Sequence, residues 1–298
     1  MGSGITGEAL FERLHYLASR VRHSRWLAGQ ARLWAALQPP ISRWIERRYA
    51  RKGILTWVNG VEPPVWLDRS IGNAYGARGP YWQERDYYQA FVAALTPASC
   101  VLDVGASFGL FTLGACTHAT SGRVYAFEPA PPAAALLERH LRLNRAEGRV
   151  ECHRVAVGDR DGTCVLHVPP LHNMSSLGRP NTLIRPEWGE AAVASVEVSM
   201  VTLDSFCSSR GISPDAIKID VEGAEVMVLR GARGTLARHK PLVFCEVHPA
   251  QMEAIGHSLA EFQSLVEELG YVATQIGPTR GGGIFNARLA PLEAPVRK

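Results

Sequence analysis

Residues 101–109, which read V-L-D-V-G-A-S-F-G, constrain the fold of this chain more than any other stretch. A short apolar run that ends in a carboxylate and passes into glycines is typical of a buried parallel strand, a tight turn and a helix. A second such strand is expected at residues 123–127 and leads into Glu128, 19 residues after Gly109. An acidic residue about 20 residues beyond a glycine-rich turn suits the two hydroxyl groups of a ribose. These strands predict a nucleoside site at the carboxyl ends of a parallel sheet.

The spacing of the glycines distinguishes two kinds of nucleoside cofactor. A dinucleotide site is expected to read G-x-G-x-x-G, in which the second glycine admits a pyrophosphate. This chain reads D-x-G-x-x-x-G, with Ala106 and Ser107 in the turn. Asp103 would repel a pyrophosphate, because both are negative, but it suits the ammonium group of a methionine moiety. The local chemistry therefore favours S-adenosylmethionine over NAD.

Strands and helices alternate regularly in the second part of the chain. Strands are expected at residues 101–104, 124–127, 150–157, 216–222 and 241–248, and helices at 82–95, 110–117, 132–143, 223–229 and 258–269. Such alternation predicts an α/β fold with a doubly wound, mostly parallel sheet. Residues 271–276 and 283–289 are expected to close the sheet as an antiparallel pair, so the last strand is antiparallel.

Positive charge is concentrated in the first 52 residues of the chain. Residues 1–52 hold ten lysines and arginines against three acids, a net charge of +7, while the whole chain carries +4 and the remainder therefore −3. Apolar residues at helical spacing predict a basic helical N-terminal extension here. It is interpreted as an amphipathic segment that packs on the body or on a second copy, which is compatible with a homodimer. Nucleic acid is not the expected partner, although arginines among tryptophans keep that alternative open.

The rest of the chain divides into three further parts. Residues 53–81 predict a hairpin with Asn59-Gly60 as its turn, followed by a loop. Residues 82–290 predict the catalytic domain, with an insertion at 162–202 that interrupts the alternation, and residues 291–298 predict a flexible tail. Within the insertion, His172, Asn173, Ser175 and Ser176 are candidate acceptor-binding residues. The alternative is that His172 and Asn173 only cap their own turn.

Composition bears on location. No apolar run reaches the 18 residues of a membrane-spanning helix, and no basic start precedes an apolar segment as in a signal peptide. The six cysteines are scattered and form no C-x-x-C pair, which favours free thiols in a reducing compartment. These observations predict a cytoplasmic protein without an integral membrane segment.

Four titratable residues are expected to meet at the carboxyl ends of two neighbouring strands. Period 2 places Asp220 with Glu222 on one face of the strand at 216–222, and Glu246 with His248 on one face of the next. Such groups are costly to bury on apolar strands without a function. The four residues therefore form the predicted catalytic cluster.

Five motifs together resemble a known family. V-L-D-V-G-A-S-F-G-L-F-T, F-E-P, V-T-L-D-S-F, I-K-I-D-V-E-G-A-E and F-C-E-V-H-P, in this order, are similar to those of the FkbM-type S-adenosylmethionine-dependent methyltransferases. The resemblance covers roughly residues 82–289. It implies a class I methyltransferase (Rossmann-like) fold and O-methylation of a small-molecule hydroxyl, on a sugar, glycoside, polyketide or other secondary metabolite.

The resemblance also implies roles for individual residues. The turn after the first strand would hold the methionine end, Glu128 the ribose and residues 156–159 the adenine edge. The residues expected at the cofactor are Asp103, Gly105, Ala106, Ser107, Phe108, Gly109, Glu128, Pro129, Ala156, Val157, Asp159 and Asp220.

The catalytic step leaves two routes open, because an aliphatic hydroxyl holds its proton far above neutral pH. In the first, His248 is the general base and Glu246 orients it. In the second, Asp220 with Glu246 or His248 holds a divalent metal ion, magnesium by the oxygen ligands or manganese by the histidine. Two further hypotheses are an RNA or protein methyltransferase recruited by the basic extension, and a non-catalytic subunit that only binds the cofactor.

Overall fold

The computed structural model describes residues 53–68, 71–72, 75, 84–168 and 193–292. The chain divides into two compact units, residues 1–85 and 86–298. The predicted N-terminal helices, most of the loop at 73–80 and residues 293–298 lie outside the described residues. So do His172, Asn173, Ser175 and Ser176 of the insertion.

The first unit contains the predicted hairpin. Strands β1 (Ile54–Thr56) and β2 (Val65–Leu67) pair antiparallel, with Ile54 opposite Leu67. Asn59 and Gly60 both adopt positive φ, as an Asn-Gly turn requires, but they lie in a short 3-10 helix, η2 (Val58–Gly60). The strands are therefore joined by a connection longer than a two-residue turn, and each is only three residues long.

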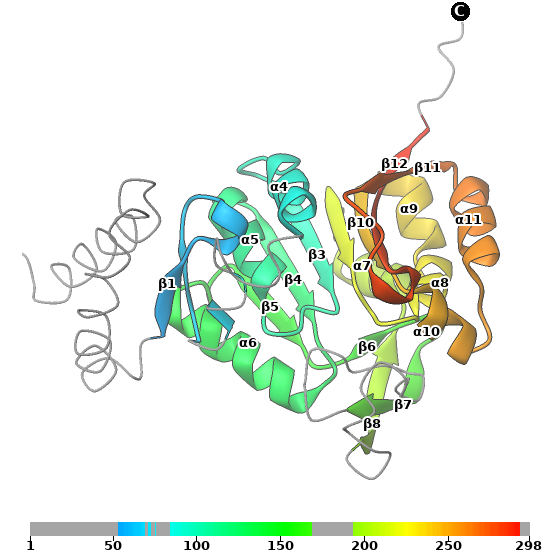
Figure 1. The fold of residues 1–298 in the computed structure, drawn as a ribbon, viewed down its shortest axis with the longest axis horizontal. Coiled ribbons are helices and arrows are strands. Elements are labelled where there is room, and N and C mark those ends of the chain that lie inside the picture. The colour runs from blue at the N-terminus through cyan, green and yellow to red at the C-terminus, as the bar shows by residue number, and fades with distance from the viewer. Residues whose placement is uncertain (1–52, 69–70, 73–74, 76–83, 169–192, 293–298) are drawn as a thin grey trace, which may run out of the picture. The chain divides into compact units, whose positions relative to one another are not determined.

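The second unit is built on a seven-stranded sheet. Its strands are β3 (Cys100–Val104), β4 (Arg123–Phe127), β5 (Val150–His153), β9 (Ala216–Ile219), β10 (Leu242–Val247), β11 (Tyr271–Ile276) and β12 (Phe285–Pro291). They are ordered β5-β4-β3-β9-β10-β12-β11 (Figure 1). The first five are parallel, and β12 is antiparallel to both of its neighbours. The predicted doubly wound sheet with an antiparallel last strand is confirmed.

Strand order reverses between β3 and β9, because the chain leaves β3 towards β4 and β5 and returns on the other side. In open α/β sheets such a switch point opens a crevice at the carboxyl ends of the strands, where ligands bind. The glycine-rich turn follows β3, and Asp220 follows β9, so both lie at this switch point.

Eight helices of the described residues connect or follow these strands. They are α4 (Arg85–Ala93), α5 (Leu110–His118), α6 (Pro131–Leu143), α7 (Leu203–Arg210), α8 (Glu225–Arg230), α9 (Arg233–His239), α10 (Pro249–Ala254) and α11 (Leu259–Glu268). Their starts follow local rules. Prolines open α6, as predicted. Ser258 caps α11, its hydroxyl accepting from the backbone N–H of Glu261 at 3.1 Å. No helix in the described part of the chain has the length and hydropathy needed to cross a membrane.

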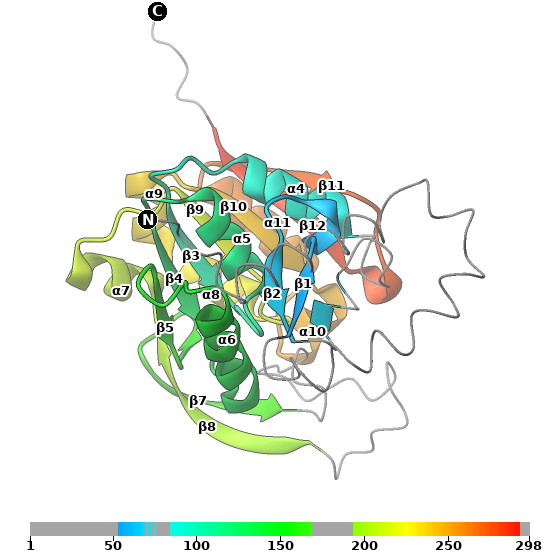
Figure 2. The same ribbon diagram turned by 90° about the vertical axis from the view of Figure 1, so that its left-hand side faces the viewer.

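Alternation along the strands separates two faces of the sheet. One face packs on apolar residues of α7, α8, α9 and α11 through Leu102, Val104, Ile217, Ile219, Val243 and Cys245. The opposite face carries Phe244, whose ring meets Phe91 of α4 edge-on at 5.4 Å. Phe91 in turn meets Phe111 of α5 at 5.2 Å. Figures 1 and 2 show α4, α5 and α6 together on one side of the sheet, with α8, α9 and α11 on the other.

One uninterrupted strand was expected at residues 150–157, and this prediction is wrong. The strand breaks after His153, and β6 (Ala156–Val157) joins a separate three-stranded sheet with β7 (Gly162–Val168) and β8 (Ala194–Val201). The break occurs because Ala156 and Val157 pair with Met200 and Val201 rather than with β4. The two β-like runs of the insertion thus form a long antiparallel hairpin.

Candidate active site

The turn after β3 needs glycine because the protein's own backbone approaches it. Gly105 has φ +76, and a Cβ atom placed there would lie 1.8 Å from the carbonyl oxygen of Asp220. Gly109 has φ +89, and its Cβ would lie 2.4 Å from the side chain of Leu137. Glycines at both positions avoid these clashes, and Gly105 also lines the pocket described below. They allow the β3 turn to pack against the β9 turn and against α6.

Glu128 is held rigidly beside this turn. One carboxylate oxygen accepts from the backbone N–H of Ser107 at 2.7 Å and the other from that of Ala130 at 2.8 Å. The side chain is 6% exposed. Burial raises the pKa of this carboxyl to about 7, against the opposing effect of the two N–H donors. The sequence predicted an acid at this position, and the structure fixes its orientation.

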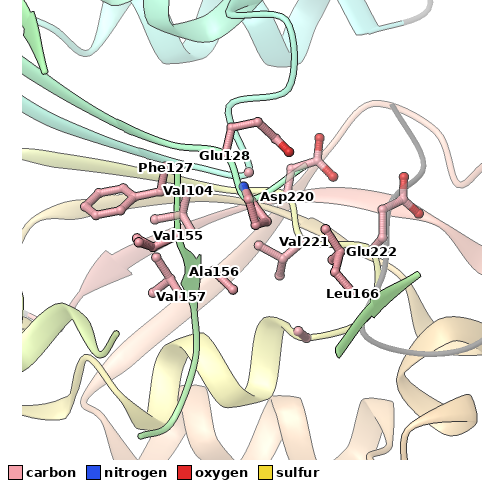
Figure 3. A pocket seen from close by; sticks show the side chains of 13 residues that line it. Val104, Phe127, Glu128, Val155, Ala156, Val157, Leu166, Asp220, Val221 and Glu222 are labelled. Carbon is pink, nitrogen blue, oxygen red and sulfur yellow. The ribbon is translucent and has the colours of Figure 1, made fainter. Parts of the chain in front are cut away.

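Glu128 lines a pocket at the switch point. The lining residues are Val104, Gly105, Phe127, Glu128, Pro129, Val155, Ala156, Val157, Leu166, Asp220, Val221, Glu222 and Ala224. Figure 3 shows apolar side chains such as Phe127 and Val157 on the left, with the carboxylates of Glu128, Asp220 and Glu222 on the right. The pocket therefore combines a largely apolar lining with an acidic wall formed by these three carboxylates.

Half of the predicted cofactor residues line this pocket. Gly105, Glu128, Pro129, Ala156, Val157 and Asp220 do so, whereas Asp103, Ala106, Ser107, Phe108, Gly109 and Asp159 are not among its lining residues. The side chain of Asp159 pairs instead with Arg160 at 3.1 Å. Leu166 and Val155, which the sequence did not single out, reach the pocket because the β7–β8 hairpin and the strand break bring them there.

Asp103 lies beneath the turn. It is fully buried, and one carboxylate oxygen accepts from the hydroxyl of Thr112 at 2.5 Å. Burial raises the pKa of this carboxyl, and Lys218 and Thr112 oppose the rise. The other oxygen of Asp103 and the hydroxyl of Ser107 are buried without a hydrogen-bond partner among the described residues. Buried polar atoms normally have partners, so this turn is suited to a ligand with polar groups.

The four predicted catalytic residues converge, but not through strand alternation. Strand β9 ends at Ile219 and β10 at Val247, so Asp220, Glu222 and His248 lie in the turns that follow. The period-2 argument is therefore wrong for these residues. The Nε2 atom of His248 nevertheless lies 3.6 Å from Glu222 Oε2, 3.7 Å from Glu246 Oε1 and 3.9 Å from Asp220 Oδ1.

Glu225 orients His248, and the sequence reasoning missed it. The Nδ1 atom of His248 lies 2.7 Å from Glu225 Oε1, and both side chains are almost completely buried. Glu225 also accepts from the backbone N–H of Gly223 at 3.1 Å. Glu246, suggested as the orienting group, instead accepts from Arg280 at 2.6 Å. The available signal was position, since Glu225 closes the I-K-I-D-V-E-G-A-E motif as an acid at the first position of an apolar helix.

Two cations hold the acidic cluster together. Lys218 lies buried inside β9, with Nζ 3.0 Å from Asp220 Oδ2. Nζ also lies 4.9 Å from the centre of the Phe111 ring. Burial raises the pKa of Asp220, but Lys218 and His248 outweigh burial and leave it lowered. Arg280 holds Glu246 in the same way from the loop before β12.

The remaining two groups of the cluster show the effect of its excess negative charge. The pKa of Glu222 is raised to about 7, first by burial and then by Asp220 and Glu246, against the opposing effect of His248. Burial lowers the pKa of His248, but Glu222, Glu225 and Glu246 outweigh burial and raise it well above its usual value. The cluster therefore favours an added positive charge.

The cysteines take no part in this site. All six are free; Cys116, Cys207 and Cys245 are buried and Cys100, Cys152 and Cys164 are partly buried. The expectation of free thiols is confirmed, although only half of them are fully buried.

Comparison with known proteins identifies the family. The model of the methyltransferase FkbM domain matches residues 103–273, more than half of the chain. The chain is 31% identical over 180 residues to the 31-O-demethyl-FK506 methyltransferase FkbM of Streptomyces tacrolimicus, covering 52% of this chain and 67% of that protein. It is 27% identical over 201 residues to the 2-O-methyltransferase NoeI of Sinorhizobium fredii, covering 64% and 77%.

Another relative matches over a shorter segment, and a solved structure matches less closely. The methyltransferase sdnD of Sordaria araneosa is 30% identical over 162 residues, which is 47% of this chain and 62% of that protein. The crystal structure of a methyltransferase FkbM from Methylobacillus flagellatus is 18% identical with a TM-score of 0.45, covering 65% of this chain and 44% of that one. From residue 103 to residue 273, the part that holds both the pocket and the acidic cluster, the chain belongs to the FkbM methyltransferase family.

Proposed function

We propose that this chain is an S-adenosylmethionine-dependent O-methyltransferase that acts on a hydroxyl of a small molecule, such as a sugar, glycoside, polyketide or other secondary metabolite. The observation that carries the proposal is a single pocket lined both by the fixed carboxylate of Glu128 and by Asp220 and Glu222. The first suits a nucleoside, and the others suit proton removal beside it. The relatives named as O-methyltransferases support the same proposed activity.

The pocket fits this cofactor better than a dinucleotide. Glu128 would accept from the ribose hydroxyls, and Ala156 and Val157 would contact the adenine. The turn after β3, which contributes Gly105 to the lining, would lie against the methionine end. When bound, the cofactor supplies a methyl group on a positively charged sulfur. A pyrophosphate would be repelled by the carboxylates that line the acidic wall.

Within the cluster, Glu222 is the proposed acceptor of the hydroxyl proton. It lines the pocket, whereas His248 is only 2% exposed and is not among the lining residues. Asp220 lines the pocket too, but Lys218 already holds one of its oxygens. Glu222 has φ +52, a left-handed conformation that is strained for a non-glycine residue and is typical of functional sites. The ring of His248 is fixed by Glu225 and does not line the pocket. Its proposed role is to position the carboxylates of the cluster.

Transfer of a radiolabelled methyl group from S-adenosylmethionine tests this proposal. The full chain is incubated with a panel of hydroxylated sugars and polyketides, and label on oxygen is expected for at least one class. Glu222→Gln is expected to lower kcat by roughly 10²- to 10⁴-fold, the usual contribution of a general base. Glu138→Gln is the matched control, because Glu138 forms an exposed pair with Arg154. Undiminished turnover in Glu222→Gln would remove Glu222 from the mechanism.

The competing proposal is an RNA or protein methyltransferase recruited by the basic residues 1–52, whose net charge is +7. It predicts label on a macromolecule and none on the small acceptors. For RNA, binding should weaken steeply as salt rises, since phosphate contacts release counterions. Activity on a small hydroxylated acceptor that is insensitive to salt would exclude this alternative.

A further inference from the structure

The Nε2 atom of His248, inside the acidic cluster, lies beyond hydrogen-bond distance of the carboxylates that the structure describes around it. Nε2 of His248 lies 3.6 to 3.9 Å from oxygens of three carboxylates, Asp220, Glu222 and Glu246. An N–H group that donated to any of them would lie about 2.7–3.2 Å away. The side chain is 2% exposed, so water does not surround this nitrogen. The spacing is too long for direct hydrogen bonds and leaves room for an atom between the groups.

The same atoms match the ligand set of one cation. One ligand atom each from Asp220, Glu246 and His248 lie within 4.8 Å of one another. Opposite ligands of an ion with bonds of about 2.1 Å are about 4.2 Å apart. The separations are at most about 0.6 Å wider than this span, so small side-chain movements would bring the three atoms towards one ion.

The surroundings orient each ligand for this role. Metal-binding histidines usually give their second ring nitrogen to a carboxylate, which fixes the ring. Nδ1 of His248 has such a partner in the fully buried Glu225, at 2.7 Å. Lys218 holds Oδ2 of Asp220 and leaves Oδ1 towards His248, and Arg280 holds Glu246. Each proposed ligand is thus held from outside.

Charge supplies an independent argument. The cluster contains four carboxylates, on Asp220, Glu222, Glu225 and Glu246, and two cations, on Lys218 and Arg280. A metal-bound imidazole is neutral, so with all four carboxylates ionised two negative charges would remain in this largely buried region. Without an ion, the proton that these acids favour on His248 and the raised pKa of Glu222 offset part of this charge. Uncompensated buried charge is costly. One divalent cation would balance it.

We infer that Asp220, Glu246 and His248 bind one divalent cation, manganese in preference to magnesium, beside the acceptor end of the pocket. The inference rests on the proposed function, since the ion would hold the acceptor hydroxyl and make its proton easier to remove by Glu222. Two carboxylates suit either ion, and the imidazole favours manganese. Glu225 is then a positioning residue for the ion site.

Manganese binding to the chelator-treated full chain tests the site without reference to activity. Titration with MnCl₂, followed by the electron paramagnetic resonance of free Mn²⁺, is expected to show one tight ion per chain. Glu246→Gln is expected to weaken binding at least tenfold. Glu225→Gln is expected to weaken it by roughly 10- to 100-fold, as partners of metal ligands usually do. Glu268→Gln, which alters only an exposed pair with Arg233, should bind as the wild type does.

Two further measurements distinguish a failure of the ion site from a failure of the proposed function. Pulsed paramagnetic resonance of the wild-type complex is expected to show a directly bound imidazole nitrogen, which needs no variant to fold. S-adenosylhomocysteine is titrated into the same samples. A protein that binds this nucleoside but takes up no manganese, or binds manganese without nitrogen coupling, overturns the ion site and leaves the proposed function standing. A protein that binds neither overturns the proposed function itself.

Discussion

The carbonyl oxygen of Asp220 lies where a Cβ atom at Gly105 would have to be, since only 1.8 Å would separate the two. This contact joins the turn after β3 to the turn after β9 across the switch point of the sheet. It couples the two acidic regions of the pocket. Glu128 accepts a hydrogen bond from Ser107 in the turn after β3, and Asp220 is the first residue of the turn after β9. Changes at Gly105 should therefore affect both.

Gly105→Ala is expected to destabilise the protein more than positive φ alone explains. Left-handed backbone costs a non-glycine residue about 1–2 kcal/mol, and the clash with Asp220 adds to this. Gly211→Ala is the matched control, because Gly211 has φ +63 but nothing within 4 Å of its Cβ position. Urea unfolding measures both. Equal losses for the two variants would show that the contact with Asp220 relaxes freely.

Lys218→Met is expected to cost about 3–5 kcal/mol of unfolding free energy, because it leaves the carboxylate of Asp220 buried without its cation. The double variant Lys218→Met with Asp220→Asn should lose less than the sum of the single variants. Residues in direct contact usually couple by about 0.5–3 kcal/mol. Chemical unfolding of all four proteins gives the coupling, and strictly additive losses would contradict the pairing.

Glu128 should give stability a distinctive pH dependence. Burial raises the pKa of this carboxyl from 4.5 to about 7, with Asp220 acting in the same direction and Lys218 and the N–H groups of Ser107 and Ala130 opposing it. The folded protein thus keeps a proton that the unfolded chain releases above about pH 4.5. The resulting stabilisation is complete below that pH and is lost as pH rises to about 7.

Glu128→Gln has no such proton to lose. Its stability relative to the wild type should therefore improve between pH 4.5 and pH 8 by roughly 3 kcal/mol, whatever constant cost the amide brings. Urea unfolding across this range measures the difference, with Glu138→Gln as the exposed control. A difference that stays constant with pH would mean that Glu128 ionises as readily in the folded protein as in the unfolded chain.

Local patterns were enough to predict the sheet and much of the site. Apolar runs located the parallel strands, a helix was expected at 258–269 where α11 lies, and the spacing from the glycine turn to Glu128 pointed to the pocket. These features depend on neighbours in sequence, so the sequence shows them directly.

Other features depend on contacts between distant segments. The residues from 150 to 157 favour a strand throughout, and only pairing of Ala156 with Met200 decides where that strand breaks. Asp220 and Glu222 would fit the alternation of a longer strand equally well. The sequence therefore did not show where β9 ends. Glu225 and Arg280 become partners of His248 and Glu246 only after folding, from 23 and 34 residues away.

The most direct test of the account is calorimetric titration of the full chain with S-adenosylhomocysteine and with NAD. Micromolar binding of the first alone is predicted. Glu128→Ala should weaken it tenfold or more, because hydrogen bonds to a charged group contribute about 1.5–3 kcal/mol. Glu138→Ala should leave it unchanged. Binding of NAD, binding of neither, or binding of S-adenosylhomocysteine that does not depend on Glu128 would contradict the assignment of this pocket.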